Sequence, residues 1–128
     1  MSAFDRAFVK LLPLTPKPIV RRVASRYVAG ESLDDAMAAV KRLNAWGAMA
    51  TIDVLGEFIT TIDASYPTRD AYLAVLDAIH AQKLDANVSV KLTAFGLSLD
   101  IEECYRSVKA VVMRARDRGN FVRIDMED

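Results

Sequence analysis

The sequence predicts an α/β fold built on parallel strands. Three short runs alternate apolar and polar residues with period two, which is typical of strands that bury one face. These runs are residues 50–57, 88–97 and 121–128. A helical pattern lies between each run and the next, and the strand starts at Met49, Val88 and Phe121 suit successive βαβ units of about 30 or more residues.

Each run has one apolar and one polar face. Apolar side chains of the central run share one face, at Val88, Val90, Leu92 and Ala94. The other face carries Ser89, Lys91 and Thr93. A parallel sheet that is buried on both faces reads as a nearly continuous apolar run. We therefore expect one face of this sheet to line a polar site.

Helical patterns precede the first strand. Residues 1–14 form a short amphipathic arm, and prolines follow it. A helix is predicted from Thr15 to Gly30. Pro16 suits its first turn, because an amide hydrogen at that position would have no acceptor within the helix. A second helix is predicted from Ser32 to Gly47.

Two further helices separate the strands. Thr68 is predicted to cap the first, which runs to about Lys83, and Asp100 with Glu103 forms the start of the second. Apolar residues of the second helix recur at helical spacing and predict a core stripe, at Ile101, Cys104, Tyr105, Val108, Val111, Val112 and Ala115. Cys104 is interpreted as a small buried hydrophobe.

The composition excludes several classes of protein. Lys plus Arg and Asp plus Glu both number 17, so the chain lacks the basic character of a nucleic-acid binder. One cysteine cannot form an intrachain disulfide and fits a reducing compartment. No apolar run approaches the roughly 20 residues of a membrane span. We expect a cytoplasmic protein, with peripheral contact at the inner face of the membrane left open.

The carboxyl ends of the strands carry the candidate chemistry, because sites of α/β folds gather there. These ends hold Asp53 and Glu57, then Lys91, then Arg123, Asp125, Glu127 and Asp128. A lysine facing acids on neighbouring strands is either a structural ion pair or part of a site.

No nucleotide-binding glycine pattern or metal-binding signature occurs, and we predict no metal site. His80 has no second ligand at metal-binding spacing, which favours a surface or packing role.

Three segments resemble the first three strand motifs of the proline dehydrogenases, in particular the monofunctional bacterial type. They are residues 51–57 (TIDVLGE), 90–97 (VKLTAFGL) and 122–128 (VRIDMED). The motifs come in the family's order, and residues 28–32 fit the segment that precedes them. The resemblance covers most of the chain.

The resemblance implies a distorted (βα)8 TIM barrel that uses FAD to oxidise L-proline to Δ1-pyrroline-5-carboxylate and passes the electrons to a quinone. Lys91 matches the family's lysine that holds the proline carboxylate, and Asp125 matches the catalytic aspartate beside the substrate ring. Glu57 matches a gate glutamate that pairs with a late arginine. Glu127 lies in the third motif and receives no role.

A complete barrel takes about 250 residues. The resemblance therefore implies a partial barrel, with an N-terminal helical segment over 1–47 and the first three strands and two helices over 48–128. The family's flavin-binding segments are expected beyond Asp128, and the piece is expected to be inactive alone. Two alternatives remain, a folate-linked flavin reductase with the same kind of barrel and a non-catalytic assembly module.

Overall fold

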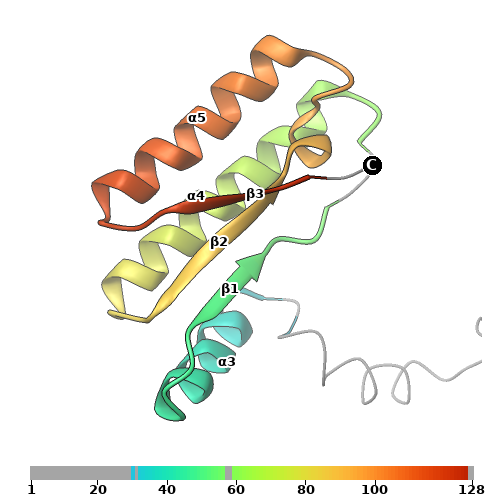
Figure 1. Ribbon diagram of the computed structural model, residues 1–128. Helices are drawn as coiled ribbons and strands as arrows, with labels where there is room; N and C mark the ends of the chain where they lie inside the picture. The colour runs from blue at the N-terminus through green and yellow to red at the C-terminus, as the bar shows by residue number, and fades with distance from the viewer. Residues whose placement is uncertain (1–29, 31, 57–58, 127–128) are drawn as a thin grey trace, which may run out of the picture. The chain divides into compact units, whose positions relative to one another are not determined.

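The computed structural model of the protein describes residues 30, 32–56 and 59–126. Contacts divide the chain into two units, Met1–Ser32 and Leu33–Asp128, and the second contains every element described below (Figure 1). The predicted arm over residues 1–14 and the predicted helix over 15–30 fall on residues whose structure is not described, apart from Gly30. The predicted division between residues 47 and 48 stays a prediction.

The second unit alternates helices and strands, as expected. In chain order the elements are α3 (Leu33–Ala45), β1 (Ala50–Asp53), the 3-10 helix η2 (Ile62–Ala64), α4 (Ser65–Ala81), β2 (Ala86–Lys91), the 3-10 helix η3 (Leu92–Phe95), α5 (Ile101–Asp117) and β3 (Val122–Asp125).

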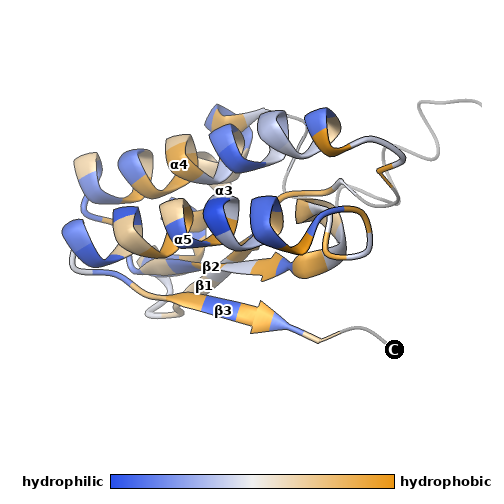
Figure 2. Cartoon of the chain, turned by 90° about the horizontal axis from the view of Figure 1, so that it is seen from above, coloured by the Kyte–Doolittle hydropathy of each residue, from blue (hydrophilic) through white to orange (hydrophobic). Residues whose placement is uncertain are grey.

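The three strands form one parallel sheet in the order β1-β2-β3, which confirms the α/β prediction. Helices α4 and α5 pack against each other and lie on the same face of the sheet (Figures 1 and 2). Within the described residues no helix covers the opposite face. The strands are therefore wound in one direction only, each helix returning the chain on the same side.

The core lies between the sheet and this helical layer. Val88 and Val90 of β2 are fully buried, and they belong to one apolar cluster with Leu76 of α4 and Val111 of α5. Removing this apolar surface from water supplies the main free energy that holds the layers together. The alternation read from the central run is correct over these strand positions.

All three strands are shorter than the runs that predicted them. The predicted strand over 88–97 is wrong after Lys91, where the chain enters η3, so Leu92 and Thr93 do not continue the strand faces. The reason is the turn that follows, because Gly96 adopts a left-handed conformation at φ +84° and its amide bonds back to Thr93. The alternation of apolar and polar residues in the sequence continues past Lys91, where the hydrogen bonds of the sheet end.

The predicted start of α4 at Thr68 is also wrong. The helix begins at Ser65, directly after η2, and Pro67 lies in its first turn. Amides in the first turn of a helix have no acceptor within the helix, so a proline there removes no needed bond. The proline was therefore compatible with a helix that had already begun.

Helix α5 confirms its predicted cap and corrects its predicted core. The Asp100 side chain accepts a hydrogen bond from the amide of Glu103 at 3.0 Å. Cys104 is buried, as expected, but Ile101 and Tyr105 are 66% and 61% exposed. The seven apolar residues cover more of the helix circumference than the side that reaches the sheet. Periodicity alone could not tell which of them face the core.

No helix in the described ranges is long and apolar enough to cross a membrane.

Candidate functional site

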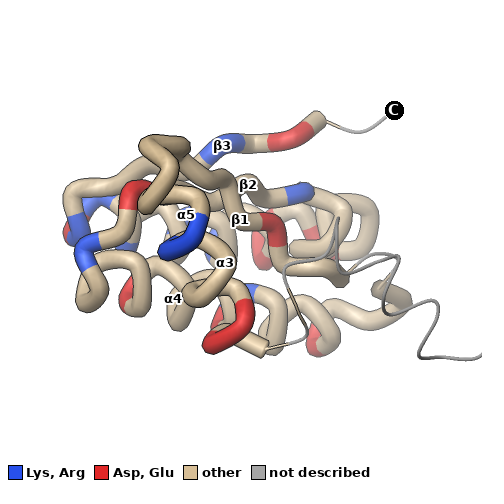
Figure 3. The backbone as a smooth tube through the Cα atoms, turned by 90° about the horizontal axis from the view of Figure 1, so that it is seen from below, with Lys and Arg blue, Asp and Glu red and all other residues tan. Residues whose placement is uncertain are grey.

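The polar face of the sheet is assembled from alternate residues of all three strands. Register pairs Asp53 with Ser89 across β1 and β2, Ser89 with Arg123 across β2 and β3, and Lys91 with Asp125 at the carboxyl end of the same pair. Because side chains alternate along a strand, these residues share the face that α4 and α5 leave open. Figure 3 shows acidic and basic positions along this end of the sheet.

Lys91 and Asp125, two residues predicted for the site, are cross-strand neighbours. Parallel strands lie roughly 4.8 Å apart, so the register places a positively charged residue beside a negatively charged one. Lys91 is half-buried at the last position of β2, and Asp125 is exposed at the last position of β3. Glu57, Glu127 and Asp128, which the sequence also placed here, lie outside the described residues.

Tyr72 of α4 contributes a polar group that the sequence prediction did not assign to the site. Its hydroxyl oxygen lies 2.8 Å from Oδ1 of Asp53 and 2.6 Å from the carbonyl oxygen of Ser89. It accepts a hydrogen bond from the amide of Val54 at 3.1 Å. The helical pattern placed Tyr72 among the inward residues, which is correct, since the side chain is 1% exposed. A buried tyrosine needs a hydrogen-bond partner for its hydroxyl, and this requirement was the feature of the sequence that could have indicated Tyr72.

The surroundings keep the Tyr72 hydroxyl protonated. Burial is the largest cause that raises its pKa above the usual tyrosine value, and the Asp53 carboxylate raises it further. The hydrogen bond from Val54 acts in the opposite direction and lowers the pKa, but burial dominates. The group is therefore a neutral hydrogen-bond donor at physiological pH.

A second polar row crosses the sheet nearer the amino ends of the strands. Asn87 is buried on the polar face, and its Oδ1 accepts bonds from Thr51 Oγ1 and Arg123 Nε, both at 3.1 Å. The Arg123 guanidinium also lies 5.4 Å from the centre of the Phe121 ring. These bonds draw Arg123 away from the carboxyl edge, although the sequence grouped it with the charges there. Asn87 was not singled out, because the predicted strand began at Val88, whereas β2 begins at Ala86 and includes Asn87.

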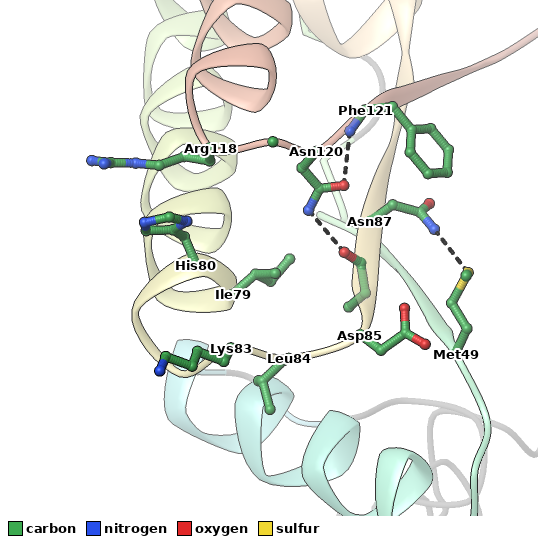
Figure 4. A pocket seen from close by; sticks show the side chains of 12 residues that line it. Met49, Ile79, His80, Lys83, Leu84, Asp85, Asn87, Arg118, Asn120 and Phe121 are labelled. Carbon is green, nitrogen blue, oxygen red and sulfur yellow. Dashed lines mark hydrogen bonds between the residues drawn. The ribbon is translucent and has the colours of Figure 1, made fainter.

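A cavity of about 420 Å³ lies at the opposite edge of the sheet, among the amino ends of the strands (Figure 4). His80 in the last turn of α4 and Lys83 just after that helix line it together with Asn87 and Asn120. It contains neither Lys91 nor Asp125, and sites of open α/β sheets gather at the carboxyl ends of the strands instead. We therefore place the candidate site at the carboxyl edge and give His80 the surface role that its sequence context favoured.

In the part of the chain that the structure describes, no group of three or more His, Cys, Asp and Glu side chains is placed to hold a metal ion.

Several curated proteins that are similar to this chain are named proline dehydrogenase. No family model matches the chain. Proline dehydrogenase 1 of Bacillus subtilis subsp. natto is 37% identical over 105 residues, which are 82% of this chain and 35% of that protein. Proline dehydrogenase of Deinococcus radiodurans is 32% identical over 109 residues, 83% of this chain and 35% of that protein. The chain thus spans about a third of the length of these curated relatives.

A solved structure has a similar fold. It is the crystal structure of proline utilization A (PutA) from Bdellovibrio bacteriovorus inactivated by N-propargylglycine, with a TM-score of 0.68 and 22% sequence identity. The similarity covers 79% of this chain and 13% of that chain. At this level of identity the likeness concerns the fold alone.

Proposed function

Because this chain is homologous to the curated proline dehydrogenases over 82% of its length, we propose that it forms part of an FAD-dependent proline dehydrogenase. The proposed reaction oxidises L-proline to Δ1-pyrroline-5-carboxylate in proline catabolism, with a quinone as the final electron acceptor. A cytoplasmic protein that meets the membrane peripherally would reach such an acceptor.

The proposed architecture is a (βα)8 barrel of which this chain forms the first three strands. The strand order β1-β2-β3 with both connecting helices on one face supports it, because doubly wound sheets place helices on both faces. In a barrel the face without helices lines the interior, and the site lies at the carboxyl ends of the strands. Lys91 and Asp125 lie at those ends.

The pairing of Lys91 with Asp125 is the observation that carries the proposal. Proline is a zwitterion whose carboxylate and secondary ammonium groups are attached to the same carbon atom. An ammonium and a carboxylate at paired positions of adjacent strands present the two charges that are opposite to those of the zwitterion. Lys91 binds the proline carboxylate, and Asp125 faces the substrate amine and the ring carbon beside it. Strands hold both groups more rigidly than loops would.

Glu57 is proposed as a gate that pairs with an arginine elsewhere in the complete protein.

The described residues of the polar face can bind a small substrate, but they are too few to hold the whole FAD molecule. Their donor set on the polar face is small, and it includes one lysine at the carboxyl edge and the arginine that Asn87 holds lower down. FAD, when bound, accepts the hydride from the ring carbon next to nitrogen. We propose that the residues that bind FAD lie beyond Asp128.

The test completes the barrel with a known enzyme. The matched segment of Bacillus subtilis proline dehydrogenase 1 is replaced by this chain, and the visible spectrum of the flavin is recorded without oxygen before and after L-proline is added. Bleaching of the flavin supports the function, and a fully folded, flavin-loaded hybrid that does not bleach contradicts it. The 128-residue chain alone, mixed with FAD, is expected to retain no flavin.

A further inference from the structure

The end of β1 is the place where Tyr72 acts. In the ladder between β1 and β2, the amide of Ala50 donates to the carbonyl of Asp85 at 3.2 Å. A parallel ladder repeats every two residues on each strand, so the amide of Val54 and the carbonyl of Ser89 form the corresponding pair four residues later. The Tyr72 hydroxyl contacts both members of that pair, at 3.1 and 2.6 Å. It therefore sits at the step where β1 leaves the sheet.

The same hydroxyl contacts the side chain that points to the polar face. Oδ1 of Asp53 lies 2.8 Å from it. A hydroxyl has one proton, so it donates either to Asp53 or to the Ser89 carbonyl while the Val54 amide donates to its oxygen. The ring cannot move away, because it is buried and packs on Phe95 with ring centres 5.6 Å apart. Phe95 belongs to η3, which directly follows Lys91.

We infer that Tyr72 is a positioning residue of the candidate site, which ends the pairing of β1 with β2 and fixes the Asp53 carboxylate at the carboxyl edge of the sheet. Asp53 is then a further acid of the polar face, in the row below Lys91 and Asp125. The role of Asp53 toward proline rests on the proposed function, whereas its attachment to Tyr72 does not.

Asp53 has a definite task in this arrangement. Its row lies one side-chain repeat below the Lys91–Asp125 row, and it adds negative charge on the side of the site away from β3. A carboxylate there favours the ammonium form of a bound amine and helps to orient it. Because the Tyr72 hydroxyl can donate its hydrogen bond to the Ser89 carbonyl instead, Asp53 can accept a donor from a ligand without leaving the tyrosine hydroxyl unsatisfied.

The first test uses the 128-residue chain and Tyr72→Phe, which removes the hydroxyl and keeps the ring. Tyr105→Phe is the matched control, because Tyr105 is exposed on α5. We expect hydrogen exchange of the Val54 amide to accelerate roughly 5- to 10-fold in Tyr72→Phe, since one hydrogen bond contributes about 1 kcal/mol. We also expect the carboxyl-carbon NMR resonance of Asp53 to shift. If neither signal differs from the Tyr105→Phe control, Tyr72 does not hold Asp53 and the inference is wrong.

The second test asks whether Tyr72 acts through Asp53. Tyr72→Phe and Asp53→Asn are combined in the hybrid enzyme, and kcat and KM for L-proline are measured for both single variants and the double variant. We expect Tyr72→Phe to lower kcat/KM about 5- to 20-fold alone and to have little effect beside Asp53→Asn. Additive losses would show that Tyr72 only supports the fold. A folded, flavin-loaded hybrid without proline activity would contradict the proposed function, and the Val54 and Asp53 signals would still decide the attachment.

Discussion

Lys91 and Asp125 indicate a binding site only because they lie next to each other. Either residue alone is an ordinary charge at the end of a strand, and a structural ion pair was an equally good interpretation of the sequence. The register places them opposite each other on the face that no described helix covers. Neighbouring opposite charges on an open face contribute little to stability, which is why we propose a role in binding for them.

Lys91→Ala tests this binding role in the hybrid enzyme. Loss of a charge-assisted hydrogen bond of about 1.5–3 kcal/mol should raise KM for L-proline roughly 10- to 150-fold, with flavin content unchanged. Steady-state kinetics and the flavin absorbance measure the two quantities. Lys83→Ala is the control, because Lys83 lines the cavity at the opposite edge of the sheet. An unchanged KM in Lys91→Ala would remove the carboxylate assignment.

Tyr72 should make the stability of the chain depend on alkaline pH. Its folded pKa is raised, chiefly by burial, above the usual value of 10.0 that the unfolded chain shows. The folded state therefore keeps the proton where the unfolded state releases it, so the contribution of Tyr72 is complete below about pH 10 and is lost as the pH rises above it. Urea unfolding between pH 8 and 11 should show a smaller alkaline loss in Tyr72→Phe than in the parent chain. Parallel profiles would contradict this expectation.

The turn after β2 is the decisive element of the fold, because it ends the strand at Lys91. Gly96 closes this turn at φ +84°, and a Cβ atom there would lie 2.5 Å from Cδ1 of Ile62. Two constraints thus act on one residue, the left-handed backbone and the close approach of the segment before α4. Together with the contact between Phe95 and Tyr72, they hold the carboxyl end of β2 against α4.

Gly96→Ala should therefore destabilise the chain more than Gly119→Ala does. Both glycines have positive φ, so each substitution costs about 1 kcal/mol in backbone strain. A Cβ atom at Gly119 would meet no atom within 4 Å, whereas at Gly96 the overlap with Ile62 adds about 1–3 kcal/mol. Free energies of unfolding from urea titration would separate the two variants. Equal losses would indicate that Ile62 moves aside without cost.

The second unit has one core, so its three strands should lose their structure together. Leu76 is fully buried at the centre of the apolar cluster that joins α4, α5 and β2. Leu76→Ala should lower the free energy of unfolding by about 2–5 kcal/mol, by lost transfer energy and the cavity left behind. Circular dichroism of the helices and amide signals of the three strands should report the same transition.

Leu55→Ala is the control for this experiment, because Leu55 is 76% exposed and its loss should change stability by less than about 0.5 kcal/mol. Separate transitions for the helices and the strands would contradict a single cooperative unit.

Two of the exposed apolar features in the described part of the molecule lie on α5 and at β3. Ile101 and Tyr105 of α5 are exposed, and so are Ile124 and Met126 at and after the end of β3. A barrel continues beyond its third strand with a further helix and strand on this side, and the proposed architecture would cover both features.

Local pattern determined much of this protein. Period-two alternation identified all three strands and the polar face, because the side chains of a strand alternate whatever surrounds it. The capping residue Asp100 and Gly47 after α3 are likewise local signals, and the structure places both as expected. The resemblance of three motifs to the proline dehydrogenases agrees with the curated relatives.

Only the tertiary structure decided where the strands end and which distant side chains contact their ends. Gly96 in the turn after β2 lies close to Ile62, and Tyr72 contacts Val54 and Ser89 at the end of β1. These contacts join residues that are 17 to 34 positions apart in the chain, and no local pattern encodes which distant side chain will be the partner. The exposed apolar residues of α5 were not predictable for the same reason. An apolar stripe shows which residues can be buried, whereas the packing partner determines which of them are buried.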